Sequence, residues 1–364
     1  DLSLPGLHLA REPRRAYPLD VAAAHVTGFV DASGKAFYGV EEHHDDALRG
    51  APGSLVGPYG SDPRAYRAPV DGTSLVLTID RELQAVASTA LAEAVAHQQA
   101  TGGSIVILEP ATGALLASAS WPSFDPNDVG GADPATFPDP AVSAIYEPGS
   151  VLKSVTIAAG LDAGVIQPDS TYEDTGTIEV GGLTIANWDN LPHGTTTMTE
   201  LLAHSLNVGA VTVAEALGPE RFYGALAAFG FGHATGVDVA GEVDGLVNWP
   251  TGDAAWHAGQ MATTSFGQGI AATPLQVAAA IAAIANDGRL MRPHVVAATL
   301  APDGTISPVA PQLVRQVVSP QTARQVREML AEVVSSRVAQ AAVPGYRVAG
   351  KTGTSQIPIP GGYD

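Results

Sequence analysis

The chain has 364 residues, 45% of them hydrophobic, with a formal net charge of −19 and an isoelectric point near 4.7. This acidic balance excludes nucleic acid as a general partner, because phosphates require a basic protein surface. The chain contains no cysteine, which excludes disulfides and cysteine-ligated metals.

The length allows two domains, and the composition of the chain changes near residue 70. Residues 1–70 are rich in proline, glycine and charged side chains, a composition that interrupts long regular elements. We expect a small, irregular, sheet-containing N-terminal domain over 1–70 and the main domain over 71–364.

The first elements of the main domain follow from local patterns. A β-prone run at 75–79 predicts a strand, and Asp80 is a typical N-cap for a helix over 81–99, whose apolar residues recur at helical spacing. Residues 104–108 and 114–120 flank a turn and predict a hairpin. An apolar helix begins at 148–150 and runs to about residue 161.

The rest of the chain alternates turns and helices. Gly181 and Gly182 predict a second hairpin within 177–185. A strand is predicted at 346–356. Helices are predicted over 197–204, 208–217, 219–229, 273–286 and 320–336. Helices clustered beside a mainly antiparallel sheet define the α+β class.

Lysine is rare in this chain: of 18 Lys and Arg residues only three are Lys, and two of these lie in motifs that could carry chemistry. Lys153 follows Ser150 by three residues, so both side chains lie on one helix face. A serine hydroxyl becomes nucleophilic when a neighbouring base takes its proton, and a buried lysine near a second cation can be such a base. Taken alone, the pair occurs by chance in many proteins and is better explained as an exposed Ser and Lys on an ordinary helix.

A second motif, Ser205-Leu206-Asn207, lies between two predicted helices. Its serine could pass a proton to a leaving amine as a general acid, and Asn207 could bind a substrate amide. Helix capping alone would explain both residue types at this place.

The third motif, Lys351-Thr352-Gly353-Thr354, follows the predicted strand. Lys351, Thr352 and Thr354 could bind a substrate carboxylate, and Gly353 allows a ligand to approach the backbone. The N–H groups of Ser150 and Thr354 could together form an oxyanion hole. Trp188 and Asp189, between the first two motifs, are candidates for one wall of a substrate groove.

The order Ser-x-x-Lys, Ser-x-Asn, Lys-Thr-Gly resembles the active-site triplet of penicillin-recognising serine acyltransferases. Nearly the whole chain resembles the class B penicillin-binding proteins, which are monofunctional peptidoglycan D,D-transpeptidases. Further segments carry this resemblance: 24–53, Leu77-Thr78-Ile79-Asp80, Tyr146-Glu147-Pro148-Gly149, Phe266-Gly267-Gln268-Gly269, Thr273-Pro274-Leu275-Gln276 and Leu290-Met291-Arg292-Pro293-His294.

The resemblance implies a transpeptidase domain of the penicillin-binding-protein and β-lactamase fold, preceded by part of a pedestal domain. Ser150 would form an acyl-enzyme with the D-Ala-D-Ala end of a peptidoglycan stem peptide, with Lys153 and Ser205 as proton carriers. β-Lactams would acylate the same serine. No metal or cofactor is implied, and the spacing of the ten histidines predicts no metal site.

The resemblance also implies a location and partners. Family members act on the outer face of the bacterial cytoplasmic membrane, held by one N-terminal membrane helix, which we expect to be missing from this sequence, and with a membrane glycosyltransferase and other cell-wall synthesis proteins as partners. They continue after the third motif with a strand and a C-terminal helix, so we expect the natural protein to be longer.

Three alternatives share these motifs. A D,D-carboxypeptidase or a serine β-lactamase would transfer the acyl group to water, and a β-lactam sensor or cell-wall scaffold would not turn over. No glutamate between Ser150 and Lys351 is followed four residues later by asparagine, so the deacylation signature of class A β-lactamases is absent. The complete motifs argue against a non-catalytic protein.

Overall fold

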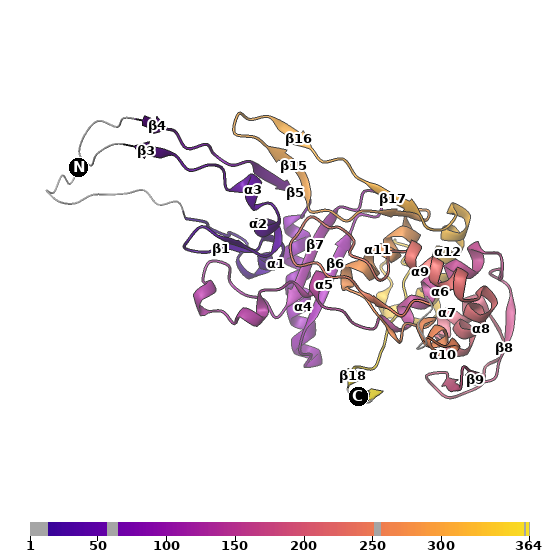
Figure 1. Ribbon diagram of the computed structural model, residues 1–364. Coiled ribbons are helices and arrows are strands. Elements are labelled where there is room, and N and C mark those ends of the chain that lie inside the picture. The colour runs from indigo at the N-terminus through magenta and orange to yellow at the C-terminus, as the bar shows by residue number, and fades with distance from the viewer. Residues whose placement is uncertain (1–13, 57–64, 251–255, 360–361, 364) are drawn as a thin grey trace.

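The computed structural model describes residues 14–56, 65–250, 256–359 and 362–363. The N-terminal region lies at one end of the molecule and most helices gather at the other, with a hairpin and one long helix between them (Figure 1). Helices and antiparallel strands are both abundant, which confirms the α+β class. No helix among the described residues is long and apolar enough to cross a membrane.

The N-terminal region consists of short elements, as its proline and glycine content predicts. They are η1 (Asp20–Ala22), α1 (Ala24–Thr27), β1 (Phe29–Val30), β2 (Ala36–Phe37), α2 (Gly39–His43), α3 (Asp45–Leu48), β3 (Ser54–Val56) and β4 (Ala65–Arg67). Phe29 packs edge-on against Phe124 and Phe137, so a loop of the main domain contributes to the core of this region.

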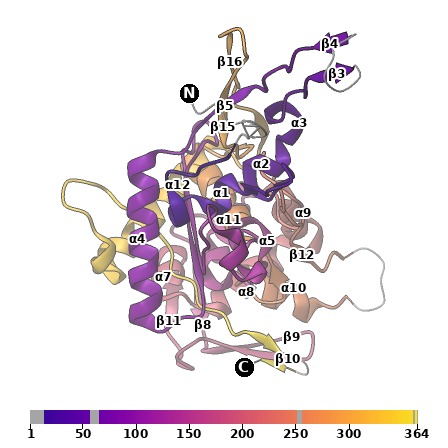
Figure 2. The same ribbon diagram turned by 90° about the vertical axis from the view of Figure 1, so that its left-hand side faces the viewer.

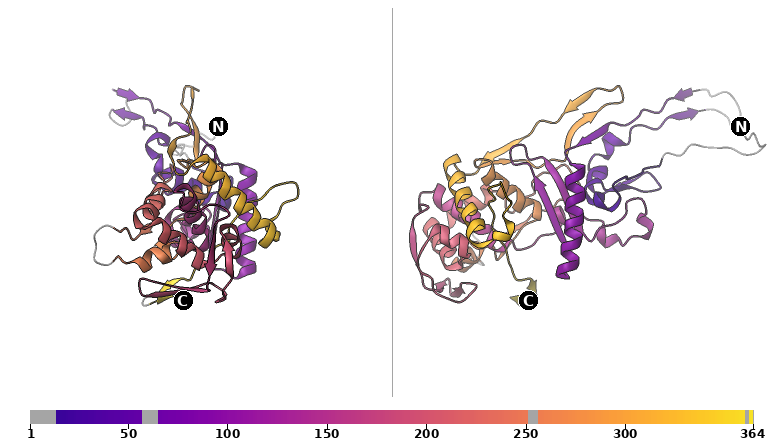
Figure 3. Two further views of the ribbon diagram at one scale, coloured as in Figure 1. Left: turned by 90° about the vertical axis from the view of Figure 1, so that its right-hand side faces the viewer. Right: turned by 180° about the vertical axis from the view of Figure 1, so that it is seen from behind.

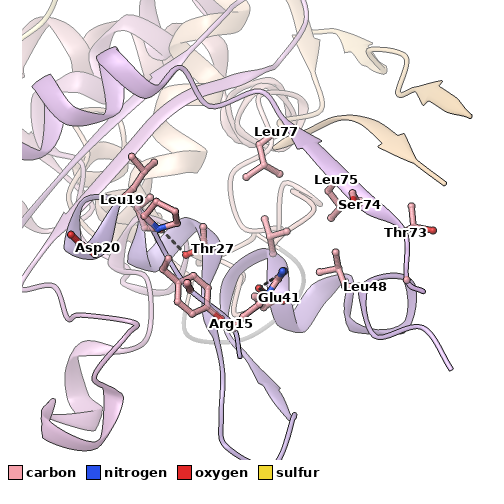
Figure 4. A pocket seen from close by; sticks show the side chains of 16 residues that line it. Arg15, Leu19, Asp20, Thr27, Glu41, Leu48, Thr73, Ser74, Leu75 and Leu77 are labelled. Atoms are coloured by element: carbon pink, nitrogen blue, oxygen red, sulfur yellow. Dashed lines mark hydrogen bonds and ion pairs between the residues drawn. The ribbon is translucent and has the colours of Figure 1, made fainter. Parts of the chain in front are cut away.

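A cavity of about 390 Å³ lies where the N-terminal region meets strand β5 (Ser74–Leu77) (Figure 4). Arg15 donates a 2.7 Å hydrogen bond to the buried carboxylate of Glu41 at its edge. Leucines at 19, 48, 75 and 77 make its apolar wall. No residue of the three motifs lines this cavity.

A sheet and a hairpin form the middle of the molecule. Strand β15 (Val296–Leu300) pairs with β5 and with β16 (Ile306–Pro308), while β6 (Gly103–Leu108) and β7 (Leu115–Trp121) form the predicted hairpin, all antiparallel. Helix α4 (Arg81–Gln98) packs its buried Leu91 and Val95 against this hairpin (Figure 2). Asp80 caps α4 as predicted, its Oδ1 accepting from the N–H groups of Glu82 and Leu83.

The helices gather at one end of the molecule (Figure 3) and surround α6 (Lys153–Asp162). Residues 153–161 of α6 are all buried. Around α6 lie α7 (Met198–His204), α8 (Asn207–Leu217), α9 (Pro219–Ala228), α10 (Ala258–Thr264), α11 (Pro274–Ala285) and α12 (Pro320–Arg337), and the short α5 (Pro140–Ser143) precedes them in the chain. Capping boxes at Thr197 and Thr273 start α7 and α11. These boundaries confirm the predicted helices.

Small antiparallel strand pairs complete the described fold. They are β8 (Thr171–Asp174) with β11 (Gly194–Thr197), β9 (Thr177–Val180) with β10 (Leu183–Ala186), β12 (Leu246–Val247) with β13 (Ile270–Ala271), β14 (Arg289–Met291) with β17 (Leu313–Gln316), and β18 (Pro358–Ile359) with β19 (Gly362–Tyr363). The β9–β10 pair is the hairpin predicted around Gly181 and Gly182.

The predicted strand at 346–356 is wrong. Residue 346 is a bend, and residues 347–356 have no regular secondary structure and pair with no strand among the described residues. A strand needs a ladder of backbone hydrogen bonds, and in this segment the N–H groups of Tyr346 and Gly350 instead donate isolated bonds to the carbonyl oxygens of Val343 and of Leu330 in α12. The β-branched and aromatic residues of this segment favour a strand locally, but no neighbouring strand among the described residues pairs with it.

Candidate active site

Ser150 lies in the short 3-10 turn Gly149–Leu152 that leads into α6. Gly149 before it has φ of +56°, a left-handed conformation that favours glycine. A Cβ at this glycine would lie 2.4 Å from the carbonyl oxygen of Thr354, so only glycine lets the third motif approach Ser150. The side chain of Ser150 lines a cleft and makes no hydrogen bond with a described residue.

Lys153 is fully buried at the start of α6. Its Nζ lies 2.6 Å from the carbonyl oxygen of Ser205, 3.3 Å from Ser205 Oγ and 2.8 Å from Asn207 Oδ1. Burial, and then the positive charge of Lys351, hold the pKa of Lys153 well below its usual value. The arrangement therefore favours a neutral amine, the form that can accept a proton.

Ser205 joins the two lysines of the motifs. Lys351 Nζ donates a 2.9 Å hydrogen bond to Ser205 Oγ, which also lies within reach of Lys153. Ser205 ends α7 with φ of +57°, a conformation that costs a non-glycine residue about 1–2 kcal/mol. Burial lowers the pKa of Lys351 to about 8.

The side chain of Asn207, which we expected to contact a substrate amide, forms hydrogen bonds within the protein. Its Oδ1 accepts from Lys153, and its Nδ2 donates a 2.9 Å hydrogen bond to the carbonyl oxygen of Ala186. Both ends of the carboxamide are thus engaged inside the protein, and the predicted binding of substrate by Asn207 stays a prediction.

The third motif runs against the start of the nucleophile turn. A Cβ at Gly353 would lie 2.8 Å from Val151 Cγ2 and 2.9 Å from the carbonyl oxygen of Pro148, so this close approach requires glycine. Ser355, the residue after the motif, donates a 2.7 Å hydrogen bond from its hydroxyl to the carbonyl oxygen of Glu147. The backbone of Thr354 therefore lies beside Gly149, and the oxyanion hole expected from the N–H groups of Ser150 and Thr354 stays a prediction.

One cleft of about 1070 Å³ connects these groups. Its lining includes the motif residues Ser150, Ser205, Asn207, Thr352 and Thr354. Other lining residues include Leu183, Thr263, Phe266, Gln268, Trp188, His204 and Arg337. Trp188 thus lies on the cleft wall, as predicted, whereas Asp189 instead bonds to His193 at 2.9 Å.

The motifs do not reveal two buried residues that hold the second motif in place. Asn187 Oδ1 accepts hydrogen bonds from the backbone N–H groups of Asn207 (2.9 Å) and Val208 (3.1 Å), so it caps α8 from 20 residues upstream. Asp174 in turn accepts a 2.7 Å hydrogen bond from Asn187 Nδ2. No local signal in the sequence pairs these residues with the start of α8, because the two partners lie in different elements.

Comparison with known proteins identifies the family. The family model described as the penicillin binding protein transpeptidase domain matches residues 103–363. The penicillin-binding protein PbpB of Mycolicibacterium smegmatis is 38% identical over 97% of this chain and 56% of its own length. The peptidoglycan D,D-transpeptidase FtsI of Escherichia coli K12 is 32% identical over 99% of this chain and 60% of its own length.

A solved structure agrees with these relatives. The crystal structure of penicillin binding protein 3 from Mycobacterium tuberculosis complexed with ampicillin has a TM-score of 0.87 and 36% identity, covering 96% of this chain and 77% of that chain. The present chain spans little more than half the length of the curated relatives, 56% and 60% for the two named above. By its sequence and its fold, the chain belongs to the class B penicillin-binding proteins and includes their transpeptidase domain.

Proposed function

We propose that this chain carries a serine D,D-transpeptidase activity that cross-links peptidoglycan stem peptides. One observation supports it above the others: Lys153, fully buried and one turn after Ser150, contacts Ser205 and Asn207 and lies near the cation of Lys351. An amine held neutral in this way is the base that a serine nucleophile needs.

In the first step, Ser150 Oγ attacks the carbonyl carbon of the penultimate D-Ala of a stem peptide, and Lys153 takes the hydroxyl proton. The N–H groups of Ser150 and Thr354 stabilise the oxyanion, while Lys351, Thr352 and Thr354 hold the terminal carboxylate. The C–N bond then breaks, and the proton passes from Lys153 through Ser205 to the departing amine of D-Ala.

In the second step, the amine of a neighbouring stem peptide attacks the ester on Ser150. The new amide forms, the ester C–O bond breaks, and Ser150 regains its proton through Lys153. A β-lactam enters the first step in place of the peptide, and its opened ring stays attached to Ser150. The names of the relatives support this assignment: one is a peptidoglycan D,D-transpeptidase, and another was solved with ampicillin.

The domain division and the setting of the whole protein are part of the proposal. We place a pedestal domain at 1–70 and the transpeptidase domain at 71–364. We also place the enzyme on the outer face of the bacterial cytoplasmic membrane, working with a membrane glycosyltransferase and other cell-wall synthesis proteins. Family membership supports both assignments.

Intact-protein mass spectrometry after incubation with benzylpenicillin tests the acyl-enzyme. We expect a stable adduct on the wild-type chain and none on Ser150→Ala. Ser33→Ala removes an exposed serine whose hydroxyl bonds to Asp31, and this variant should be labelled as the wild type is. Labelling that survives in Ser150→Ala would refute the assignment. Fast loss of the adduct with drug turnover would identify a β-lactamase instead.

A second assay separates transpeptidation from carboxypeptidation. A stem peptide ending in D-Ala-D-Ala is incubated with and without an acceptor amine, and both products are measured by mass spectrometry. A transpeptidase forms the amide with the acceptor, and a carboxypeptidase forms only the shortened peptide. Exclusive hydrolysis at high acceptor concentration would favour the carboxypeptidase alternative.

A further inference from the structure

Arg337, at the C-terminal end of α12, lines the cleft together with Trp188 and His204. These three residues come from the loop after β10, the end of α7 and the end of α12. We call them the Arg337 site. The proposed mechanism uses none of them.

The guanidinium of Arg337 has a partner without negative charge. Its Nη2 lies within hydrogen-bond distance of both ring nitrogens of His204, and among the described residues it makes no ion pair. Other ion pairs of α12 are complete: Arg327 binds Asp287 at 2.8 Å, and Glu328 binds Arg347. The positive charge of Arg337 therefore stands unpaired at the cleft.

The groups around His204 form no ion pair with Arg337 among the described residues. Burial, then the charges of Arg337 and His193, lower the pKa of His204, so its ring stays neutral at neutral pH. Two carboxylates lie near, but Asp189 is bonded to His193 and Glu200 closes the capping box of α7. The neutral imidazole thus orients the guanidinium without neutralising it.

Trp188 supplies an apolar surface on the same cleft. The residue is 71% exposed, yet its Nε1 donates a 2.9 Å hydrogen bond to the carbonyl oxygen of His204. An indole fixed at one edge and open to the cleft can bury aliphatic groups of a ligand at little cost in side-chain entropy.

We propose that the Arg337 site is a subsite for a free carboxylate carried by the peptide substrate, with the aliphatic part of the same residue lying on Trp188. The inference rests on the proposed function, because it takes a peptide as the occupant of the cleft. The net charge of the chain is −19, so its surface as a whole repels an anionic peptide. An unpaired guanidinium within the cleft is a place where such a peptide gains binding energy, because arginine pairs with carboxylates in bidentate geometry.

The test compares two synthetic stem peptides that end in D-Ala-D-Ala and differ at one side chain, which ends in a carboxylate or in the corresponding carboxamide. The rate of D-Ala release gives kcat/KM for wild type, Arg337→Ala and Trp188→Ala. Arg324→Ala is the matched control, since Arg324 is an exposed arginine of α12 that does not line the cleft. Complete labelling of each variant by benzylpenicillin reports on Ser150 separately.

We expect wild type to prefer the carboxylate peptide, and Arg337→Ala to lower kcat/KM for that peptide about fivefold, mainly through KM, as for a partly exposed charge-assisted hydrogen bond. The kcat/KM of Arg337→Ala for the carboxamide peptide should equal that of the wild type. Trp188→Ala should slow both peptides, and Arg324→Ala neither. Added salt should reduce the ratio of kcat/KM for the carboxylate peptide to kcat/KM for the carboxamide peptide in the wild type.

Equal rates for the two peptides in wild type, or equal losses for both in Arg337→Ala, would overturn the subsite while penicillin labelling stays complete. Absence of penicillin labelling in wild type would overturn the proposed function and, with it, the subsite. Calorimetric binding of both peptides to Ser150→Ala gives a readout without turnover: a preference for the carboxylate peptide supports the subsite, and equal affinities contradict it.

Discussion

Replacement of Asn187 by alanine tests how the second motif is held in place. The side chain of Asn187 is only 2% exposed, and its Oδ1 is the acceptor for the first two N–H groups of α8. Loss of a helix cap costs about 0.5–2 kcal/mol. Loss of the donor to the buried carboxylate of Asp174 adds about 1.5–3 kcal/mol, as for other hydrogen bonds to charged groups.

These terms sum to roughly 2–5 kcal/mol, less than the total stability of most domains, so Asn187→Ala should fold at 25 °C with a lower Tm. The N-terminal turn of α8 carries Asn207, whose Oδ1 bonds Lys153 at 2.8 Å. A small displacement of Asn207 therefore moves a group that orients the amine of Lys153, the base of the proposed mechanism. We expect the rate of acylation by benzylpenicillin to fall about 10- to 100-fold, because misplacement of about 1 Å can cost that much.

Gln84→Ala is the matched control for lost stability. Gln84 is also a fully buried amide, and its three hydrogen bonds join α4 to the carbonyl oxygen of Ala22 and to the backbone of Ser118. Both variants are unfolded in urea, and acylation is followed by mass spectrometry in the native range. Acylation of Asn187→Ala at the wild-type rate, or an equal slowing in Gln84→Ala, would refute the positioning role.

Three further predictions concern the motifs. The pKa of Lys351 is about 8 in the folded chain and about 10.4 in an unfolded one, so between these values the unfolded chain binds more protons and the free energy of unfolding rises with pH. Urea titrations should show a weaker rise for Lys351→Met from pH 8 to 9.5 and parallel curves below pH 7; identical slopes above pH 8 would contradict the shift. The free energy of unfolding of Ser205→Ala should be about 1 kcal/mol lower than that of Ser205→Gly. Both changes remove the hydroxyl, but only alanine keeps the strain of the left-handed conformation at φ of +57°. Equal denaturation midpoints would show that the strain is absent. Gly353→Ala should slow acylation by forcing its Cβ to within 2.8 Å of Val151 Cγ2, and a second change, Val151→Ala, should restore part of the rate; no recovery would assign the defect elsewhere.

Sequence alone predicted most of the helices and the α+β class. Asp80 caps α4, and the helices that begin with Pro219, Pro274 and Pro320 start within one residue of the predicted places. These features depend on side chains within a few residues of one another, such as an N-cap carboxylate and the N–H groups two and three positions later. The three motifs were recognisable for the same reason, since each is a short run of residues.

The tertiary structure decided what joins those runs. It brings Lys153 to Ser205 and Asn207, places the segment after Gly350 against Gly149 without forming the predicted strand, and caps α8 with Asn187 rather than with a neighbour of Asn207. It also sets Arg337 against His204, 133 positions away in the sequence. Local propensity does not predict such contacts, because their free energy comes from burial and hydrogen bonding between segments that meet only in the folded chain.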